Sequence, residues 1–449
     1  MIETIFAQAT PAGHGAVVVL RLSGPQAATA LTTLTGKPPP APRRATLVAL
    51  RRPRDGELLD RSLALWFPAP ASYTGEDVVE LHLHGGRAVV AGVVGVLAEL
   101  PGLRVAEPGE FTRRAFENGR MDLTEAEGVA DLVGAETQAQ RRQALNQMGG
   151  VLSRLYEGWR ERLLHVLALL EAEIDFSDQD LPDEVTAPAW AEVRALIDEL
   201  AAHLDDGGCG ERLRDGISIA IIGPPNAGKS SLLNALARRE VAIVSTRAGT
   251  TRDVIEVHLD LAGIPVTLAD TAGLRETEDE IEAEGVRRAR QRAAHADLTI
   301  AVFDGGVWPH LDPVTLALVE SHASRTLAVV NKADLLAEGD GLGYKIAGRV
   351  APAVSARTGI GLPEVLNHLK AMVAALVPAA AAAPVVTRAR HRVAVEDCRA
   401  GLVRALTAPL PELAAEDVRL ATRALGRITG RVDVEDILDA IFSGFCIGK

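Results

Sequence analysis

A glycine-rich segment near the middle of the chain carries the residue types that bind phosphate. It runs from Gly223 to Ser230, reads GPPNAGKS and fits the spacing G-x-x-x-x-G-K-S. Glycines let backbone N–H groups close around phosphate oxygens, and the N-terminus of a following helix adds its positive dipole end. Lys229 would neutralise phosphate charge, and the Ser230 hydroxyl would bind Mg²⁺. The pattern predicts a site for nucleotide phosphates.

The residues on either side of this segment predict a strand before it and a helix after it. Ile217–Ile222 is an apolar run typical of a buried strand, and Ser231–Leu236 begins a helical pattern. A glycine-rich turn after a strand can be only a turn. The strand, loop and helix in this order favour a phosphate-binding loop.

Four further segments follow in the order that a guanine-nucleotide switch requires. They are GTTRD at Gly249–Asp253, DTAG at Asp270–Gly273, NKAD at Asn331–Asp334 and SAR at Ser355–Arg357. The Asp334 carboxylate can accept both guanine N1–H and N2–H, whereas adenine lacks this donor pair and would leave the carboxylate unpaired. Each tetrapeptide alone is a weak signal, but five segments in this order predict a GTPase.

Three of these segments directly follow apolar runs that predict strands, at Ile264–Leu268, Thr326–Val330 and Val350–Val354. Asp270 would hold Mg²⁺ through water, and Thr251 would complete the Mg²⁺ shell begun by Ser230. The residues of the five segments that we expect to bind GTP are Asn226, Ala227, Gly228, Lys229, Ser230, Ser231, Gly249, Thr250, Thr251, Asp270, Thr271, Ala272, Gly273, Asn331, Lys332, Asp334, Ser355, Ala356 and Arg357.

Hydrolysis needs a group that the DTAG segment does not supply. Leu274 follows this segment, where many regulatory GTPases carry a glutamine that orients water, and leucine cannot polarise water. Acidic residues in the run from Arg275 to Glu282 are the candidates. Spacing alone does not choose among them, and most would lie in a solvated acidic loop.

Composition places the chain among globular multidomain proteins. Its 449 residues are too many for one core, and 47% hydrophobic with 24% charged residues is ordinary for such proteins. The net charge of −13 disfavours a broad electrostatic grip on nucleic acid, although a local basic face is compatible with it. The three cysteines are far apart, which favours a reducing, cytoplasmic setting, and we expect neither a signal peptide nor a membrane helix.

The patterning of the chain changes twice. Strand-like runs at Ala16–Leu22, Ser62–Phe67 and Val78–His84 predict an N-terminal α+β domain. Amphipathic helical stretches follow from about residue 122, and Asp205–Gly210 is a predicted linker before the nucleotide-binding segment. After an Ala/Pro-rich breaker, helical patterning resumes from Thr387 to Phe442. The simplest architecture is a helical domain interrupted by an inserted doubly wound domain.

Segments outside the nucleotide motifs resemble those of the MnmE or TrmE family of tRNA-modification GTPases, and the resemblance covers the whole chain. Its specific marks are the ending Phe442–Lys449 (FSGFCIGK), Tyr73–Asp77 (YTGED), Pro108–Thr112 (PGEFT) and Asn118–Leu123 (NGRMDL). The run Gly249–Asp253 followed by Asp270–Glu276 joins them.

The resemblance implies a multidomain α/β + α fold with four segments. These are an α+β tetrahydrofolate-binding and dimerisation domain at 1–118, the first part of a discontinuous all-α helical domain at 119–212, an inserted P-loop G domain at 213–376, and the second helical part with the cysteine tail at 377–449. It further implies a homodimer that forms a heterotetramer with a flavin-dependent partner. Together they would act on tRNA and install an aminomethyl-type or carboxymethylaminomethyl group on carbon-5 of the wobble uridine, with 5-formyl-tetrahydrofolate or a related one-carbon folate as donor.

The resemblance also implies how GTP is hydrolysed. In the family, K⁺ binds when two G domains pair and supplies the charge that an arginine finger gives elsewhere. Its ligand positions fall on Asn226, Ser245, Arg247 and Thr250, so the stretch Ser245, Thr246, Arg247 and Ala248 joins the residues expected to bind GTP. Ser245 and Arg247 replace the usual threonine and an apolar residue. The water-activating role falls on Glu282.

The implied folate contacts fall on Arg21, Glu80, Arg120 and Lys449. Glu80 would accept the amino and ring N–H donors of the pterin, and the cations would meet its polar edge or the glutamate tail. Cys446 is packed tail on composition alone, but in the family the cysteine lies near the folate site, which makes it a candidate catalytic residue. A nucleophilic thiol would need nearby cations such as Lys449 or Arg120.

Two other functions compete with this one. A ribosome-assembly GTPase would bind ribosomal RNA and typically has a basic appendage, whereas the C-terminal segment here is rich in Asp and Glu. A septation or trafficking switch would need an amphipathic membrane helix with an apolar and a lysine-rich face, and no such pattern is evident.

Overall fold

The computed structural model describes residues 3–11, 13, 15–175, 183–239, 256–270, 291, 294–336, 344–378, 384–432 and 435–448. The chain forms two compact units, which are described separately below. One unit contains Met1–Ala130, Gln147–His165 and Arg419–Lys449, and the other contains Asp131–Asn146 and Val166–Val418.

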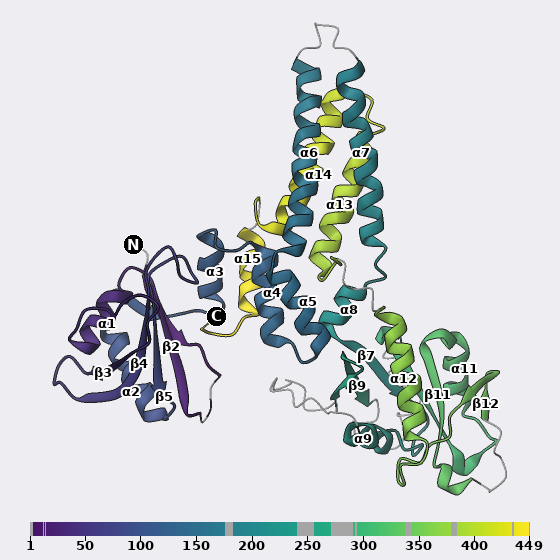
Figure 1. Ribbon diagram of the computed structural model, residues 1–449. Coiled ribbons are helices and arrows are strands. Elements are labelled where there is room, and N and C mark those ends of the chain that lie inside the picture. Colours follow the sequence, from purple (N-terminus) through teal and green to yellow (C-terminus); the bar gives the residue numbers. More distant parts are fainter. Residues whose placement is uncertain are drawn as a thin grey trace, which may run out of the picture. The chain divides into compact units, whose positions relative to one another are not determined.

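The first unit is built on a six-stranded sheet with strand order β3-β4-β5-β2-β1-β6 (Figure 1). Neighbouring strands are antiparallel except β1 and β6, which are parallel. Helices α1 and α2 share one hydrophobic core with one face of the sheet. The elements are β1 (Thr4–Gln8), β2 (Val17–Ser23), α1 (Ala27–Thr35), β3 (Thr46–Arg51), β4 (Leu58–Phe67), β5 (Val78–His84), α2 (Arg87–Glu99) and β6 (Leu103–Val105).

Alternation along the strands decides which side chains lie on the other face of this sheet. Leu20 and Leu22 on β2, and Leu81 on β5, are fully buried in the core with the helices. Because successive side chains of a strand point to opposite faces, Arg21 and Glu80 lie on the face away from α1 and α2. The predicted strands at 16–22 and 78–84 are present, shifted by one residue in β2.

The rest of the first unit is helical and holds the end of the chain. Helix α15 (Glu435–Ser443) packs against α3 (Glu110–Glu117). Beyond α15, Ile447 forms a β-bridge with Pro108. Four further helices have residues in both units: α4 (Leu123–Gly134), α5 (Gln138–Met148), α6 (Val151–Asp175) and α14 (Pro411–Thr429).

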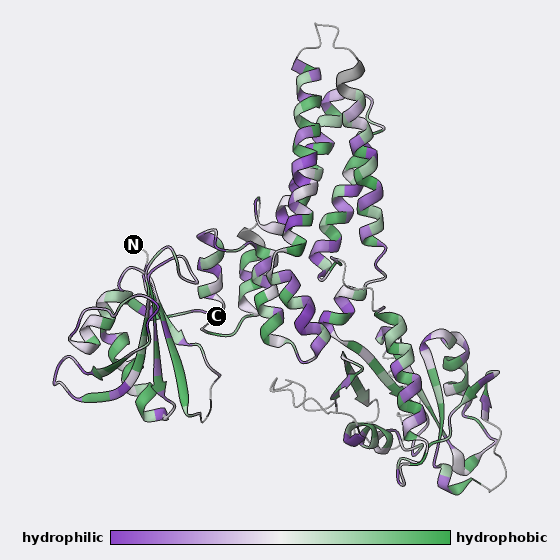
Figure 2. Cartoon of the chain, viewed as in Figure 1, coloured by the Kyte–Doolittle hydropathy of each residue, from purple (hydrophilic) through white to green (hydrophobic). Residues whose placement is uncertain are grey.

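The second unit contains a five-stranded sheet of order β11-β10-β7-β9-β8, in which only β8 is antiparallel to its neighbour. One hydrophobic core joins this sheet to α9 and α12, and a second core on its other face includes α11 residues. Figure 2 shows the strands as predominantly apolar. The elements are β7 (Ile217–Ile222), α9 (Lys229–Arg239), β8 (Glu256–Leu261), β9 (Ile264–Asp270), β10 (Leu298–Asp304), α11 (Pro313–Ser321), β11 (Thr326–Asn331) and α12 (Leu362–Leu376). Helices on both faces of a mostly parallel sheet make the doubly wound fold.

One predicted strand of this domain is wrong. Val350–Val354 does not form a continuous strand: β13 (Arg349–Ala351) pairs antiparallel with β12 (Tyr344–Ile346). Beyond it, Ala353 makes a single parallel bridge to Val330. Pro352 lies between the two pairings and has no backbone N–H to donate to a ladder. The run is therefore split, although Ser355 still follows next to the end of β11.

The chain passes between helices and the doubly wound sheet at two places that lie together. Helix α7 (Asp183–Leu204) packs against α13 (Ala389–Ala405). From α13, Arg392 donates to the Leu204 carbonyl over 3.0 Å, to Asp206 over 2.7 Å and to Glu211 over 2.9 Å. The side chain of one arginine thus connects the segment that leads from α7 into the sheet domain with α13, which follows that domain.

The predicted linker at Asp205–Gly210 is partly helix. Helix α8 begins at Cys209 and ends at Asp215. A Cβ on Gly210 would lie 2.3 Å from the Val386 carbonyl oxygen, so the glycine permits close packing. Among the described helices, none has the length and apolar composition needed to span a bilayer.

Candidate functional site

The phosphate-binding segment lies between the end of β7 and the start of α9, as its pattern predicts. Its backbone requires glycine at two positions. Gly223 has φ +149°, and a Cβ there would lie 2.3 Å from the Val302 carbonyl oxygen. Gly228 has φ +88°, and a Cβ there would lie 2.2 Å from Asn331 Nδ2. Asn226, between them, is also left-handed at φ +62°.

Lys229 is buried at the first position of α9. Its side chain is 8% exposed, and Nζ donates to the carbonyls of Gly223 and Pro224, each over 2.9 Å. The ammonium group therefore bridges the loop from the inside, close to where phosphate oxygens would lie. Ser230 follows in the first turn of the same helix, and Ser231 lines the adjoining pocket.

Asn331 links this loop to the segments at the ends of the later strands. Its Nδ2 donates to the Ala227 carbonyl over 2.8 Å, and its Oδ1 accepts the Ala356 N–H over 3.2 Å. Its side chain is 2% exposed. Three of the sequence segments, which lie far apart in the chain, are thereby fixed relative to one another by one amide.

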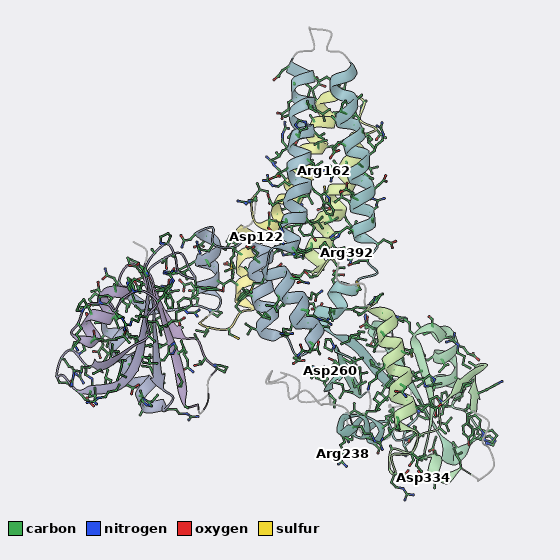
Figure 3. All side chains as sticks on the ribbon, viewed as in Figure 1. Asp122, Arg162, Arg238, Asp260, Asp334 and Arg392 are labelled. Carbon is green, nitrogen blue, oxygen red and sulfur yellow. The ribbon has the colours of Figure 1, made fainter. Side chains whose placement is uncertain are left out.

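A pocket of about 310 Å³ lies where these segments meet, a volume suited to a small ligand such as a nucleobase. Asp334, which is labelled in Figure 3, is one of the residues that line this pocket. Its carboxylate accepts from Ser355 Oγ over 2.5 Å and from Arg357 Nη2 over 2.6 Å. Lining residues are Gly228, Ser231, Asn331, Lys332, Asp334, Leu335, Ser355, Ala356 and Arg357.

Two charges around the pocket are fixed by neighbours. The hydrogen bond from Ser355, with help from Arg357, holds the pKa of Asp334 below its ordinary value, so this carboxylate stays ionised. Lys332 donates to Asp304 over 2.6 Å from a left-handed backbone conformation. The pocket therefore contains an ionised hydrogen-bond acceptor, the Asp334 carboxylate, just beyond the end of β11.

Several predicted nucleotide and metal residues lie outside the described residues. They are Ser245, Thr246, Arg247, Ala248, Gly249, Thr250, Thr251, Thr271, Ala272, Gly273 and Glu282. Asp270 is described through its backbone, as the last residue of β9. Of the proposed K⁺ ligands the structure describes Asn226, and of the proposed Mg²⁺ ligands it describes Ser230.

The first unit brings together two of the predicted folate residues. Arg21 and Glu80 are directly opposite each other on β2 and β5. Arg21 Nε and Nη2 donate to Glu80 Oε1 over 3.0 and 2.9 Å. Their side chains are 19% and 20% exposed, so the ion pair is largely withdrawn from water.

Aromatic rings that sequence reasoning did not assign to this site hold Arg21 in place. The guanidinium carbon lies 5.3 Å from the ring centre of Tyr73 and 5.7 Å from that of Phe111. Tyr73 is anchored in turn by a 2.8 Å hydrogen bond between its hydroxyl and that of Thr112. Burial raises the pKa of Tyr73, so its hydroxyl stays protonated. Tyr73 and Phe111 could have been selected from the sequence, because they belong to the YTGED and PGEFT segments.

A histidine beside Glu80 is left incompletely paired. His82 Nε2 is buried and has no hydrogen-bond partner among the described residues, and it lies 3.7 Å from Glu80 Oε2. A buried ring nitrogen without a hydrogen-bond partner is unusual in folded proteins.

The remaining candidates for this site are Arg120, Lys449 and the thiol of Cys446. The Arg120 side chain lies beside Gly75, next to the loop that carries Tyr73. Cys446 is exposed, and its carbonyl accepts the Gly109 N–H over 3.5 Å. Gly448 is packed so closely on β1 that a Cβ would lie 2.3 Å from the Gln8 carbonyl oxygen. The tail therefore reaches the strand next to the one that bears Arg21, and Lys449 lies outside the described residues.

Other residues of the recognised segments serve to hold the fold. Glu76 accepts from Ser23 over 2.7 Å and from Arg114 over 3.1 Å, and Arg114 also donates to Glu110 over 2.9 Å. Arg114 is 8% exposed. These ion pairs join the loop after β4 to α3. Glu76 and Glu110 therefore have a structural role in this unit.

Two protein-family models match the chain. The model described as "MnmE helical domain" matches residues 123–446, and the one described as "GTP-binding protein TrmE N-terminus" matches residues 4–120. Among solved structures, the G domain of the T. maritima FeoB iron transporter is 25% identical, spans 36% of this chain and 98% of its own length, and superposes with a TM-score of 0.25.

Curated relatives resemble the chain from end to end. A protein of Paramagnetospirillum magneticum is 58% identical, and proteins of Parvibaculum lavamentivorans and Rhodospirillum rubrum are each 57% identical. Each alignment covers 100% of this chain and 100% of the relative. All three relatives are named tRNA modification GTPase MnmE.

Proposed function

This chain belongs to the MnmE family of tRNA modification GTPases, and we propose on that premise that it acts in folate-dependent modification of the tRNA wobble uridine. The proposal is a K⁺-stimulated GTP hydrolase that, with a flavin-dependent partner, installs an aminomethyl or carboxymethylaminomethyl group on carbon-5. GTP hydrolysis would drive conformational change, and the folate would supply the one-carbon unit.

The observation that carries the nucleotide part is the position of Asn331. One buried amide joins the phosphate loop at Ala227 to the base pocket at Ala356. A nucleotide bound with its phosphates at Lys229 and its base at Asp334 would therefore contact a preorganised site. The carboxylate of Asp334, which is ionised, suits the two N–H donors of guanine.

Hydrolysis would use residues on both sides of the phosphates. Ser230 has the hydroxyl oxygen and Asn226 the amide oxygen that hard cations prefer, which supports Mg²⁺ and K⁺ respectively. Bound Mg²⁺ and K⁺ would supply positive charge against the developing charge of phosphoryl transfer. We propose Thr251 as the second Mg²⁺ ligand. Further K⁺ ligands would be Thr250 and the backbone carbonyls of Ser245 and Arg247. Glu282 would activate the attacking water.

The folate part is supported by the Arg21–Glu80 pair and its surroundings. Glu80 would accept pterin N–H donors while Arg21 fixes its orientation. We propose Arg120 and Lys449 as further contacts and Cys446 as a catalytic thiol. The bridge between Ile447 and Pro108 supports a tail held against this domain.

Dimerisation through the N-terminal domain is supported by apolar side chains on the face that carries Arg21. Val17, Leu47 and Leu63 are 55%, 70% and 41% exposed, and Leu47 and Leu63 are directly opposite each other. Apolar residues gathered on one side of a sheet are typical of a surface that is covered. A homodimer, and a heterotetramer with the flavin-dependent partner, would act in the cytoplasm, where three unpaired cysteines are compatible with reducing conditions.

The test combines turnover with the product. GTP turnover should be much faster in K⁺ than in Na⁺ at equal ionic strength, and Glu282→Ala should bind GTP but lose most turnover. Mass spectrometry of tRNA wobble nucleosides after deletion of the gene should show loss of the carbon-5 group. Unchanged wobble nucleosides with altered ribosome profiles would instead favour a ribosome-assembly GTPase.

A further inference from the structure

Donors from the protein itself engage both carboxylate oxygens of Asp334. Ser355 Oγ donates to Oδ1, and Arg357 Nη2 donates to Oδ2. A guanine base would present N1–H and N2–H to the same two oxygens. One carboxylate is therefore faced by donors from two sources, the protein and the base.

The two protein donors are held very differently. Ser355 is fully buried: its N–H donates to the Ile360 carbonyl over 2.9 Å, and its hydroxyl accepts the Thr358 N–H over 3.2 Å. The Arg357 side chain is 78% exposed, and its one ion pair among the described residues is with Asp334. Ser355 is thus fixed where it stands, whereas the arginine head group can swing into water.

Arginine and guanine present the same donor pattern. Each carries two N–H groups on nitrogens that share one carbon, and this fork matches the two oxygens of a carboxylate. Ser355 Oγ approaches Oδ1 alone and leaves that oxygen a second lone pair. The oxygen at issue is Oδ2, which the guanidinium and the base would both require.

We propose that Arg357 is an intramolecular competitor of guanine. Its guanidinium binds the Asp334 oxygen that the base requires and must leave for the base to bind, so it lowers nucleotide affinity by slowing association. This inference rests on the proposed guanine-binding role of Asp334. The sequence places Arg357 among the residues that support GTP binding, whereas the proposed competition makes Arg357 lower the nucleotide affinity.

The size of the effect follows from the exposure of the pair. Exposed ion pairs are weak, and a competitor reduces apparent affinity by the fraction of pockets that it leaves open, so Arg357 should weaken binding by about two- to fivefold at low salt. Because salt screens exposed charges over about 10 Å at 0.1 M, the effect should nearly vanish in concentrated salt.

The experiment measures fluorescent GDP binding to the full chain by stopped flow, at low and at high NaCl. Arg357→Gln should tighten binding two- to fivefold at low salt, mainly through faster association, and should match the unsubstituted chain at high salt. Arg357→Lys, which keeps the charge without the fork, should lie between them. The matched control is Arg349→Gln, an arginine of β13 whose side chain donates to the Ala323 carbonyl, and it should change nothing.

Two results would overturn the proposal, and they are distinguishable. If Asp334→Asn abolishes GDP binding while Arg357→Gln leaves it unchanged or weaker at low salt, the competition is absent, and weaker binding would mean that the arginine supports the bound base. If Asp334→Asn binds GDP as well as the unsubstituted chain, the guanine-binding role of Asp334 fails and the competition fails with it.

Discussion

The protein contains two carboxylate–arginine pairs, each at a site proposed to bind a flat heterocycle rich in N–H donors. Asp334 pairs with Arg357 in the doubly wound domain, and Glu80 pairs with Arg21 in the N-terminal sheet. The arginine side chains are 78% and 19% exposed, respectively. The two pairs have the same chemistry and differ in how far the arginine is buried.

Burial changes what the arginine does. Arg21 lies near two aromatic rings and is directly opposite Glu80 in the strand register, so it cannot leave without breaking several contacts. It is a fixed part of its site and leaves Glu80 Oε2 for a ligand. Among the described residues, Arg357 has one ion-pair partner, Asp334. Breaking this pair costs little free energy because water replaces the lost contact. An arginine can therefore build a site or obstruct it, depending on what else holds it.

The largest effect should come from removing the carboxylate of the exposed pair. Asp334→Asn should weaken GDP binding on the order of a thousandfold, because a site built to accept two N–H donors loses its acceptor pair. The amide N–H of asparagine can donate to the carbonyl that xanthine has in place of the guanine amino group. Equilibrium titration should therefore show xanthosine diphosphate binding the variant better than GDP; equal affinities would place base recognition elsewhere.

A third arginine extends the comparison to a fully structural position. Arg392 binds Asp206, whose side chain is 6% exposed, and Glu211. Although burial opposes the charge, these carboxylates raise the pKa of Arg392. Arg392→Met should lower the free energy of unfolding by about 3 kcal/mol, since it leaves a buried carboxylate unpaired.

Urea unfolding measures this loss, and the same helix offers a matched control. Arg404 pairs with Asp417 but is 56% exposed. Arg404→Met should therefore change stability by less than about 0.5 kcal/mol. Equal losses in the two variants would show that burial is not what distinguishes these pairs.

Much of the nucleotide site was predictable because its signals are local. The spacing from Gly223 to Ser230 predicted the loop between β7 and α9, and an apolar run predicted the strand before Asn331. Two predictions failed where a single residue acts through its neighbours. Pro352 interrupts the expected strand, and Gly210 lies in helix α8, where its small size permits close packing against Val386.

The pairing of Arg21 with Glu80 could not be predicted from local pattern. The two residues are 59 positions apart, and only the antiparallel register of β2 and β5 places them together. The resemblance to the family named both residues without indicating that they contact each other. Likewise, the competing role of Arg357 depends on its exposure, which no sequence pattern records.

Removing the buried arginine should act in the opposite direction to removing the exposed one. Arg21→Met leaves Glu80 without its partner and should lower stability by about 2 kcal/mol. It should also abolish the heat of 5-formyl-tetrahydrofolate binding in calorimetry, whereas Arg357→Gln strengthens binding at its own site. Arg54→Met, at a position between β3 and β4 whose side chain is 68% exposed, is the control and should leave both unchanged. Folate binding that survives in Arg21→Met would remove Arg21 from the site.

The smallest effect, taken over one pH unit, comes from a change of pH and probes the contacts around Arg392. Burial, opposed by Asp206, lowers the pKa of His203 to about 4 from its ordinary 6.5. The folded protein therefore keeps this ring neutral between pH 6.5 and 4, while the unfolded chain protonates it. Stability present above pH 6.5 should be lost as pH falls, at about 1.4 kcal/mol per unit from this group. His203→Gln removes the titration, so its unfolding free energy should fall less steeply between pH 6 and 5. Parallel pH profiles for the two chains would mean that His203 is protonated in the folded state, and that water reaches the contacts between Arg392 and the segment after α7.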